Sequence, residues 1–547
     1  MAACGRELAG VYSTDPNSEP PPARPPIGLS IASKPIMKAR PALDTAILMA
    51  ATALTRFVFR SRYLYDIDSV NFALALRRFD PSVHQPHPPG YFLYVCLGRL
   101  ANLLTRDANA ALVAISVVFS CGAVAMIYLL ASRWFGRNAA RFAGLVFLFS
   151  PLAWFHGTVA LTYIVEAFFS ALTGYLCWRI YGGAGRFILP GAMVVGMAAG
   201  FRPSSLLLLG PLLLFSFRGA NRRQAAAGIG ALAATLLAWF LPMLWIGGGI
   251  PYFSSLLSLW LAVPSKGTVF NSSVFNSLAR AATILGIYFL CFGCAAILPL
   301  RARSGDFSLR RRMTIFTLVW IAPGLLFFTF VFLKFVNSGY LLALAPPACA
   351  WMGLWASTWY AGLHWSRAGK IAVIAACAAS NTLIFVDAPA YCSYQEVRRF
   401  EAELRSIVRV LPQVASPRET LIVGFDSHFL GYRHAGYYLP DYQTVEFPEV
   451  QLASGIRVFA MRNRDTRLET ALPATPAGEF VLFPLPLGAS EYTDYLALVR
   501  KRFPPGGLRT VLVEGHEFIL GRVADLGLLF PGCVRGATAA TFFVNSR

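Results

Sequence analysis

The sequence predicts a mainly α-helical, polytopic membrane protein of about eleven spans, with a small α/β domain outside the membrane at its C-terminus. Of the 547 residues, 56% are hydrophobic and only 14% are charged, and the mean hydropathy is +0.55. Soluble globular domains do not reach that balance. Apolar segments long enough to cross a hydrocarbon core of about 30 Å recur along the chain, so most of it is expected to lie in lipid.

Residues 1–42 are predicted to form a disordered cytoplasmic tail. They hold a proline-rich stretch followed by Lys34, Lys38 and Arg40, and they lack a long apolar run. A segment of this composition buries too little apolar surface to fold. Because it has no apolar h-region, it does not have the pattern of a cleavable signal peptide.

The transmembrane domain is expected over residues 43–387. Its apolar segments lie near 43–59, 107–132, 140–155, 158–180, 187–201, 203–217, 225–247, 276–300, 313–333, 339–361 and 369–386. The two segments on either side of Arg202 are short and share a break at Pro203. A further apolar stretch, 91–104, is barely long enough to span, and we assign it to the membrane surface.

The distribution of Lys and Arg predicts the orientation. Alternate crossings place one set of basic loop residues on the same side as the N-terminal tail: Arg133, Arg137, Arg141, Arg179, Arg186, Arg218, Arg222, Arg223, Arg301, Arg303, Arg310, Arg311, Arg312, Arg367 and Lys370. Cytoplasmic loops collect such residues, so the C-terminal domain is predicted to lie on the non-cytoplasmic side of the membrane. That compartment is a periplasm, the extracellular space or an organelle lumen, and we expect the bacterial inner membrane as the location. The formal charge of +21 then reflects topology, and no nucleic-acid partner is expected.

Residues 388–547 change to short alternating strand and helix patterns, which predict a soluble α/β domain. We expect helices near 396–411 and 490–502, and strands near 420–425, 508–514 and 517–523. Cys392 and Cys533 both fall on the predicted non-cytoplasmic side, where a disulfide between them is possible. No motif in this domain names a partner.

The first outer loop, 60–106, carries most of the candidate chemistry. Asp66 and Asp68 follow the first span, where a carboxylate can act as a base on a lipid-linked substrate or simply cap the next helix. His84 and His87 stand on a backbone stiffened by prolines, and they either bind substrate or point into water. Two Asp and two His can also hold a divalent metal, although no compact ligand spacing demands one.

Ionisable residues at or inside the spans are the second group of candidates. Glu166 lies within a span, three residues after Tyr163 and on the same helical face. An intramembrane carboxylate is costly and is a functional candidate by default; the alternative is a protonated Glu bonded to a neighbouring helix. Arg202 and Lys334, with Tyr340 near the latter, fall at outer membrane boundaries, where a cation can bind a lipid phosphate or snorkel to the headgroups.

These residues resemble the GT-C superfamily of polytopic glycosyltransferases, especially its protein O-mannosyltransferase-like and aminoarabinose-transferase-like branches. Asp66-Ile67-Asp68-Ser69 lies in the first outer loop, the string HPPGY follows at 87–91, and Glu166 is embedded in a helix two spans later. The HPPGY string in this order is fairly specific, whereas the acids alone are weak. The motifs cover roughly residues 43–220, and the rest is alike in architecture only.

The resemblance implies that a sugar passes from a polyprenyl-phosphate donor to a lipid, glycan or protein acceptor at the outer membrane face. A loop aspartate would be the general base. On this basis the predicted catalytic residues are Asp66, Asp68 and Glu166. The predicted substrate-binding residues are His84, His87, Tyr91, Tyr163, Arg202, Lys334 and Tyr340. Related sequences often carry an acid three residues after the position matching Asp68, but this chain has Asn71 there, so the assignment rests on the pair of aspartates.

Two other classes of function compete with this hypothesis. A transporter or flippase for lipid-linked saccharides would also need intramembrane acids, phosphate-binding cations and many spans. Transporters usually have repeated halves, and the sequence has no recognisable repeat. A non-catalytic scaffold is the third interpretation, because Asn71 can mark a degenerate site.

Overall fold

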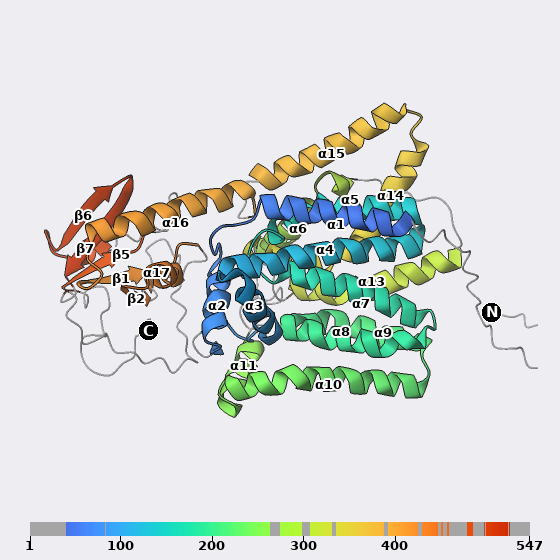
Figure 1. Cartoon of the computed structure of the whole chain (residues 1–547), viewed down its shortest axis with the longest axis horizontal. Helices are drawn as coiled ribbons and strands as arrows, with labels where there is room; N and C mark the ends of the chain where they lie inside the picture. The colour runs from blue at the N-terminus through green and yellow to red at the C-terminus, as the bar shows by residue number, and fades with distance from the viewer. Residues whose placement is uncertain are drawn as a thin grey trace, which may run out of the picture. The chain divides into compact units, whose positions relative to one another are not determined.

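The helices of the membrane domain occupy most of the chain (Figure 1). The structure is a computed structural model that describes residues 40–81, 84–262, 274–297, 307–330, 335–387, 392–424, 429–446, 450–451, 457–458, 478–484, 497, 499–522 and 525. Ten helices match predicted apolar segments: α1 (Arg40–Val58), α4 (Ala108–Phe135), α7 (Tyr163–Tyr181), α8 (Ile188–Phe201), α9 (Ser204–Ser216), α10 (Arg222–Ile246), α12 (Val274–Phe292), α13 (Phe307–Phe330), α14 (Ala345–Gly362) and α15 (Arg367–Asp387). Short 3-10 helices follow or precede several of them: η2 (Gly185–Phe187), η3 (Phe217–Gly219), η6 (Gly293–Ile297) and η7 (Phe335–Ala343).

Length and composition identify several of these helices as membrane spans. Within the described ranges, four helices are long and apolar enough to cross a membrane: Ala108–Phe135, Arg222–Ile246, Arg311–Phe328 and Arg367–Asp387. Four shorter apolar helices accompany them, at Phe92–Thr105, Gly185–Phe201, Ser204–Gly219 and Ala282–Ala296. The total of about eleven spans therefore stays a prediction.

The sequence pattern misplaced some helix boundaries. The apolar run 140–155 is divided into α5 (Arg137–Leu148) and α6 (Pro151–His156), because Ser150 caps the second helix by accepting a hydrogen bond from the Ala153 N–H at 3.2 Å. The run from 158 becomes helical only at Tyr163. A helix that we did not predict, α11 (Ile250–Ala262), follows a glycine turn in which Gly248 and Gly249 have φ of +103° and +75°.

Two helices of the first outer loop, α2 (Ile67–Arg77) and α3 (Phe92–Thr105), run across the end of the long helices (Figure 1). The α3 helix packs Tyr94, Val95 and Gly98 inward and leaves Leu103 and Leu104 75% and 88% exposed. Exposed leucines on one face and packed residues on the other are typical of a helix lying at a lipid surface. This arrangement supports the predicted surface position of 91–104.

A buried acid joins three helices at the end of the bundle where the predicted cytoplasmic arginines lie. Asp44 of α1 accepts hydrogen bonds from Tyr128 of α4 at 2.8 Å, from Arg137 at 2.6 Å and from Arg141 at 3.0 Å. Both arginines belong to α5. Two of the arginines that predict the orientation therefore also hold α1 in place.

The C-terminal part of the described chain contains a small mixed sheet flanked by helices (Figure 1). Helix α16 (Tyr394–Val414) precedes a sheet in the order β2-β1-β5-β7-β6. Its strands are β1 (Thr420–Gly424), β2 (Gln443–Glu446), β5 (Glu479–Leu482), β6 (Leu508–Val513) and β7 (His516–Arg522). Strands β2, β1 and β5 are parallel, whereas β5, β7 and β6 are antiparallel. A further strand pair joins β3 (Val450–Gln451) and β4 (Arg457–Val458), and helix α17 (Tyr432–Tyr438) lies between β1 and β2.

The predicted helix 396–411 and the three predicted strands are confirmed by α16, β1, β6 and β7. Of the predicted helix 490–502, residues 497 and 499–502 are helical, and the rest lies outside the described residues. Cys392 is a free thiol whose Sγ lies 3.3 Å from Ser338 Oγ. Its suggested disulfide partner, Cys533, lies outside the described residues.

Candidate functional site

The two loop aspartates occupy different structural positions. Asp66 is the N-cap of α2, and its Oδ1 accepts the backbone N–H of Asp68 at 2.8 Å. Asp66 therefore has the capping role that the sequence left open. Asp68 lies in the first turn of α2 with 34% of its side chain exposed. Of the two carboxylates, Asp68 is the more accessible to a substrate.

His87, from the HPPGY string, faces Asp68. Its Nδ1 lies 3.2 Å from Asp68 Oδ1, and its ring packs against Phe72 and Tyr91 with centroid separations of 5.5 and 4.7 Å. Burial lowers the pKa of His87 most strongly, Asp68 opposes that shift, and the charge of Arg202 adds to it. His87 is consequently a neutral imidazole near neutral pH, next to an accessible carboxylate.

Glu166 and Arg202 form a buried ion pair. Glu166 lies in the first turn of α7, and Arg202 lies in the break between α8 and α9. Their Oε2 and Nε atoms are 3.0 Å apart, and their side chains are 0% and 4% exposed. Ser204 and Ser205 donate to the other Glu166 oxygen at 3.2 and 3.1 Å. The Glu166 carboxylate is therefore paired with the charge of Arg202. It also accepts hydrogen bonds from a neighbouring helix, as the interpretation of a hydrogen-bonded Glu expected.

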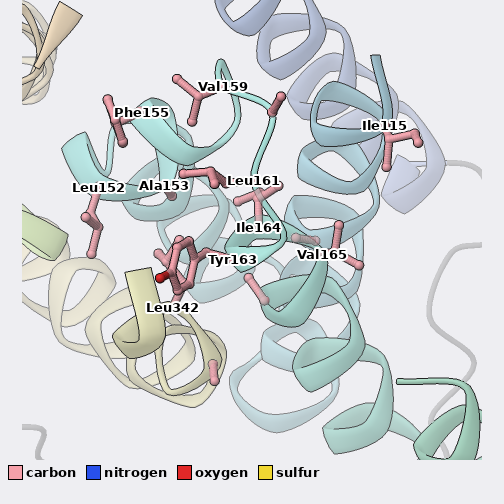
Figure 2. Close-up of a cluster of buried hydrophobic side chains, with 14 of the residues drawn as sticks. Ile115, Leu152, Ala153, Phe155, Val159, Leu161, Tyr163, Ile164, Val165 and Leu342 are labelled. Carbon is pink, nitrogen blue, oxygen red and sulfur yellow. The ribbon is translucent and has the colours of Figure 1, made fainter. Parts of the chain in front are cut away.

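Aromatic rings enclose the guanidinium of Arg202. Its Cζ lies 4.2 Å from the ring centroids of both Tyr163 and Tyr340, and its Nη1 donates to Thr162 Oγ1 at 2.7 Å. A cation held over two aromatic faces is fixed in position and stabilised electrostatically. Figure 2 shows the apolar wall around Tyr163, which includes Leu161 and Ile164 beside it and Leu342 of η7.

His156 was missed by the sequence analysis, although it joins this group. It is 2% exposed at the end of α6, and its ring centroid lies 4.7 Å from that of Tyr163. In the described part of the chain neither ring nitrogen has a hydrogen-bond partner. A Cβ at Gly339 would come within 2.6 Å of His156 Nε2 and 2.3 Å of the Tyr163 ring, so glycine is required there. An imidazole within an apolar run was the available signal.

Seven of the ten predicted site residues thus fall into two groups. Asp68, His87 and Tyr91 lie together, as do Tyr163, Glu166, Arg202 and Tyr340. His84 lies in the turn that the Asp80–Gln85 bridge closes. Lys334 lies outside the described residues.

A divalent metal finds no ready-made site in the described residues. No group of three or more His, Cys, Asp and Glu side chains is arranged there to hold an ion. Asp68 faces His87, whereas Asp66 is engaged in capping α2. The possible divalent metal therefore stays a prediction.

Residues 81–226 match the model of a protein family described as the protein O-mannosyl-transferase TMEM260 N-terminal domain. The matched range includes His87, Glu166 and Arg202 but not the two loop aspartates. A search among curated proteins found no match.

Two solved structures of ArnT from Cupriavidus metallidurans share the fold of this chain. ArnT from Cupriavidus metallidurans in the apo state is 14% identical, with 91% of this chain and 99% of that chain covered and a TM-score of 0.53. The undecaprenyl phosphate complex of ArnT is 13% identical with the same coverage and a TM-score of 0.54. The chain therefore has the fold of ArnT.

A more distant likeness links the chain to the archaeal oligosaccharyltransferase AglB from Archaeoglobus fulgidus, in complex with an inhibitory peptide and a dolichol-phosphate. It is 12% identical over 88% of this chain and 74% of that one, with a TM-score of 0.42. The match to the protein O-mannosyl-transferase domain confirms the resemblance to GT-C glycosyltransferases predicted from the sequence, and the fold shared with ArnT agrees with it. The apolar helices indicate an integral membrane protein.

Proposed function

We propose that the protein is a membrane glycosyltransferase that moves a sugar from a polyprenyl-phosphate donor to an acceptor at the outer membrane face. The observation that carries this proposal is Asp68, an accessible carboxylate in the first turn of α2 and 3.2 Å from His87. It sits in the first outer loop of a chain with the ArnT fold. The undecaprenyl phosphate bound in one ArnT structure supports a lipid phosphate as the donor carrier.

Asp68 is the general base in this proposal. Its carboxylate takes the proton from the acceptor hydroxyl or amine while the acceptor oxygen or nitrogen attacks the anomeric carbon. The bond from that carbon to the carrier phosphate breaks at the same time. His87 orients Asp68 or the acceptor from 3.2 Å away. Asp66 contributes by capping α2, which fixes the helix turn that carries Asp68.

The buried ion pair supplies the cation for the departing phosphate. We assign Arg202 to that role because Glu166, Tyr163 and Tyr340 already fix its guanidinium before any ligand binds, and a preorganised cation stabilises developing charge without reorganisation. Glu166 then positions Arg202. This role differs from the catalytic role that the resemblance implied for Glu166. Lys334 remains the second proposed phosphate contact.

The orientation and location belong to the same proposal. The N-terminus is placed in the cytoplasm and the C-terminal domain in the periplasm, with the bacterial inner membrane as the location. The support is the excess of Lys and Arg in one set of loops. The acceptor is a lipid, a glycan or a protein hydroxyl or amine.

The test is sugar transfer by the purified protein in nanodiscs. Radiolabelled polyprenyl-phosphate sugars are supplied with a panel of lipid and peptide acceptors, and wild type is compared with Asp68→Asn and Asp66→Asn. Asp80→Asn is the matched control, because Asp80 lies in the same loop and pairs with the exposed Arg78 at 2.9 Å.

Removing the base is expected to slow transfer by about 10²- to 10⁴-fold in Asp68→Asn. Asp66→Asn should keep most of the activity because Asn also caps helices well, and Asp80→Asn should match wild type. Full activity in Asp68→Asn would refute the assignment of the base. Movement of these lipids between leaflets of proteoliposomes, without any transfer or donor hydrolysis, would instead identify a flippase.

A further inference from the structure

The connection between α1 and α2 determines where Asp68 lies. Residues 59–66 are not helical, so their backbone N–H groups need partners from elsewhere in the protein. The bundle provides the first contacts: Ser61 N–H donates to the Thr158 carbonyl at 2.8 Å, and Asn109 donates to the Ser61 carbonyl at 3.0 Å. Beyond Ser61, side chains of the C-terminal part of the chain accept hydrogen bonds from the backbone of this segment.

Glu401 of α16 is the first of these partners. Its Oε1 accepts the backbone N–H of Arg62 at 2.5 Å, and its Oε2 accepts from Arg398 at 2.5 Å. Glu401 is 1% exposed and lies on a helix face that is otherwise apolar, formed by Val397, Phe400, Leu404, Ile407, Val410 and Leu411. A carboxylate on such a face is costly unless it is bonded. The hydrogen bonds from Arg62 and Arg398 offset the cost of burying the Glu401 carboxylate on this face.

Helix α17 and its flank hold the next residues of the connection. The hydroxyl of Tyr438 accepts the backbone N–H of Leu64 at 2.8 Å. The ring of Tyr65 packs against Phe400 and Phe429 with centroid separations of 5.2 and 4.8 Å. Asp66 follows directly and caps α2. The backbone that leads into the first turn of α2 is therefore fixed by side chains of the C-terminal domain.

The same domain contacts the segment on the other side of the site. Cys392, just before α16, lies 3.3 Å from Ser338 Oγ in η7. Tyr340, two residues further on, packs over the Arg202 guanidinium. The C-terminal domain thus bonds both the segment that leads to Asp68 and the segment that carries Tyr340.

We propose that the C-terminal domain sets the position of the base, and that Glu401 is the residue through which it does so. Glu401 touches no reacting atom; it acts through the backbone of Arg62 and is a positioning residue. The proposal rests on the proposed function for its catalytic consequence. Small misplacements of a catalytic group are expensive in rate, and sites need a supporting shell that locks their geometry.

Amide hydrogen exchange of the full-length protein in nanodiscs tests the contact without any assay of activity. In Glu401→Leu the Arg62 N–H loses its acceptor, so peptides covering 59–68 should exchange about tenfold or more faster than in wild type. Peptides from α4 and α7 should be unchanged. Glu401→Gln keeps an acceptor oxygen and should restore protection. Glu396→Leu is the matched control, because Glu396 lies on the same helix and pairs only with the exposed Arg399 in the described contacts.

Kinetics then test the consequence for the base. Glu401→Leu should lower kcat about tenfold or more while the donor KM stays within about twofold, because the donor contacts remain and the base is misplaced. Glu401→Gln should recover most of kcat. Tyr438→Phe removes only the hydroxyl that accepts the Leu64 N–H, so it provides a milder version of the same test if Glu401→Leu fails to fold.

The outcomes separate the two proposals. Faster exchange at 59–68 with a lower kcat supports positioning by Glu401. Unchanged exchange, or faster exchange with an unchanged kcat, overturns it. A wild-type protein that transfers no sugar with any donor overturns the proposed function, and exchange alone then decides whether the C-terminal domain holds this segment.

Discussion

Replacing Glu166 with Gln tests the electrostatics of the site most directly. Gln fills the same space and still offers an oxygen to Ser204 and Ser205, so the substitution chiefly removes the charge that faces Arg202 at 3.0 Å. Both side chains are 4% exposed or less. The guanidinium is then left buried without its counter-ion.

The expected loss of unfolding free energy can be estimated from two typical values. Removing one partner of a buried ion pair typically costs about 3–5 kcal/mol, whereas a single hydrogen bond inside a membrane protein averages about 0.6 kcal/mol. The two tyrosine rings over Arg202 still stabilise its guanidinium in part. We therefore expect Glu166→Gln to lower the free energy of unfolding by about 3 kcal/mol. Ser205→Ala, which removes one hydrogen bond to Glu166, should cost about 0.6 kcal/mol.

A double-mutant cycle measures the pair itself. Unfolding of the purified protein by sodium dodecyl sulfate in mixed micelles gives the free energy for wild type, Glu166→Gln, Arg202→Met and the double variant. The double variant removes both buried charges, so it should be more stable than the sum of the single losses predicts, by about 2 kcal/mol. Additivity within about 0.5 kcal/mol would refute the ion pair as the feature that holds Arg202.

Four further substitutions test separate parts of the structure. Gly90→Ala should destabilise by about 1–3 kcal/mol and lower transfer, because Gly90 has φ of +106° and a Cβ there would lie 2.9 Å from Met243 Sδ. Gly136 has φ of +85° but open space around it, so Gly136→Ala should lower stability less than Gly90→Ala does in a thermal unfolding assay. Asp44→Asn should lower the unfolding temperature by about 2–4 °C, since its carboxylate accepts hydrogen bonds from both α4 and α5. Burial lowers the pKa of His434 to about 4, so the unfolded chain takes up the proton first as pH falls. The free energy of unfolding should therefore fall as the pH drops from about 6.5 towards 4. At pH 5 the loss should be about 2 kcal/mol. His434→Gln should remove that part of the pH dependence of thermal unfolding.

The length of the apolar segments was enough to predict most of the helices. In lipid each span must satisfy its own backbone hydrogen bonds, and an α-helix does so. The helices that were misplaced have local causes that hydropathy does not detect. Ser150 and Pro151 start a new helix inside one apolar run, and the glycines at 247–249 separate α11 from α10. The short central strand β5, only four residues long, carries too little pattern to be recognised from sequence alone.

The site residues were recognised one by one, but their pairing was not. Hydropathy identifies Glu166 as a costly residue within a span and Arg202 as a charged residue at a membrane boundary. They come from different parts of the chain, α7 and the break between α8 and α9, and no local rule connects them. The contact of Glu401 with Arg62 spans an even longer stretch of chain. A carboxylate on the apolar face of α16 was a local signal that some distant donor must exist, although the sequence did not say which.

The position of Asn71 links the fold to the choice of base. Asn71 is 3% exposed, one turn after Asp68 in α2, and its Oδ1 has no hydrogen-bond partner within the described residues. An acid at this buried position would place a further negative charge one helical turn from Asp68, whereas the amide of Asn71 adds none. Asp66 caps α2, so the proposed chemistry assigns the base to Asp68, the more accessible carboxylate, and depends on the segments that hold it.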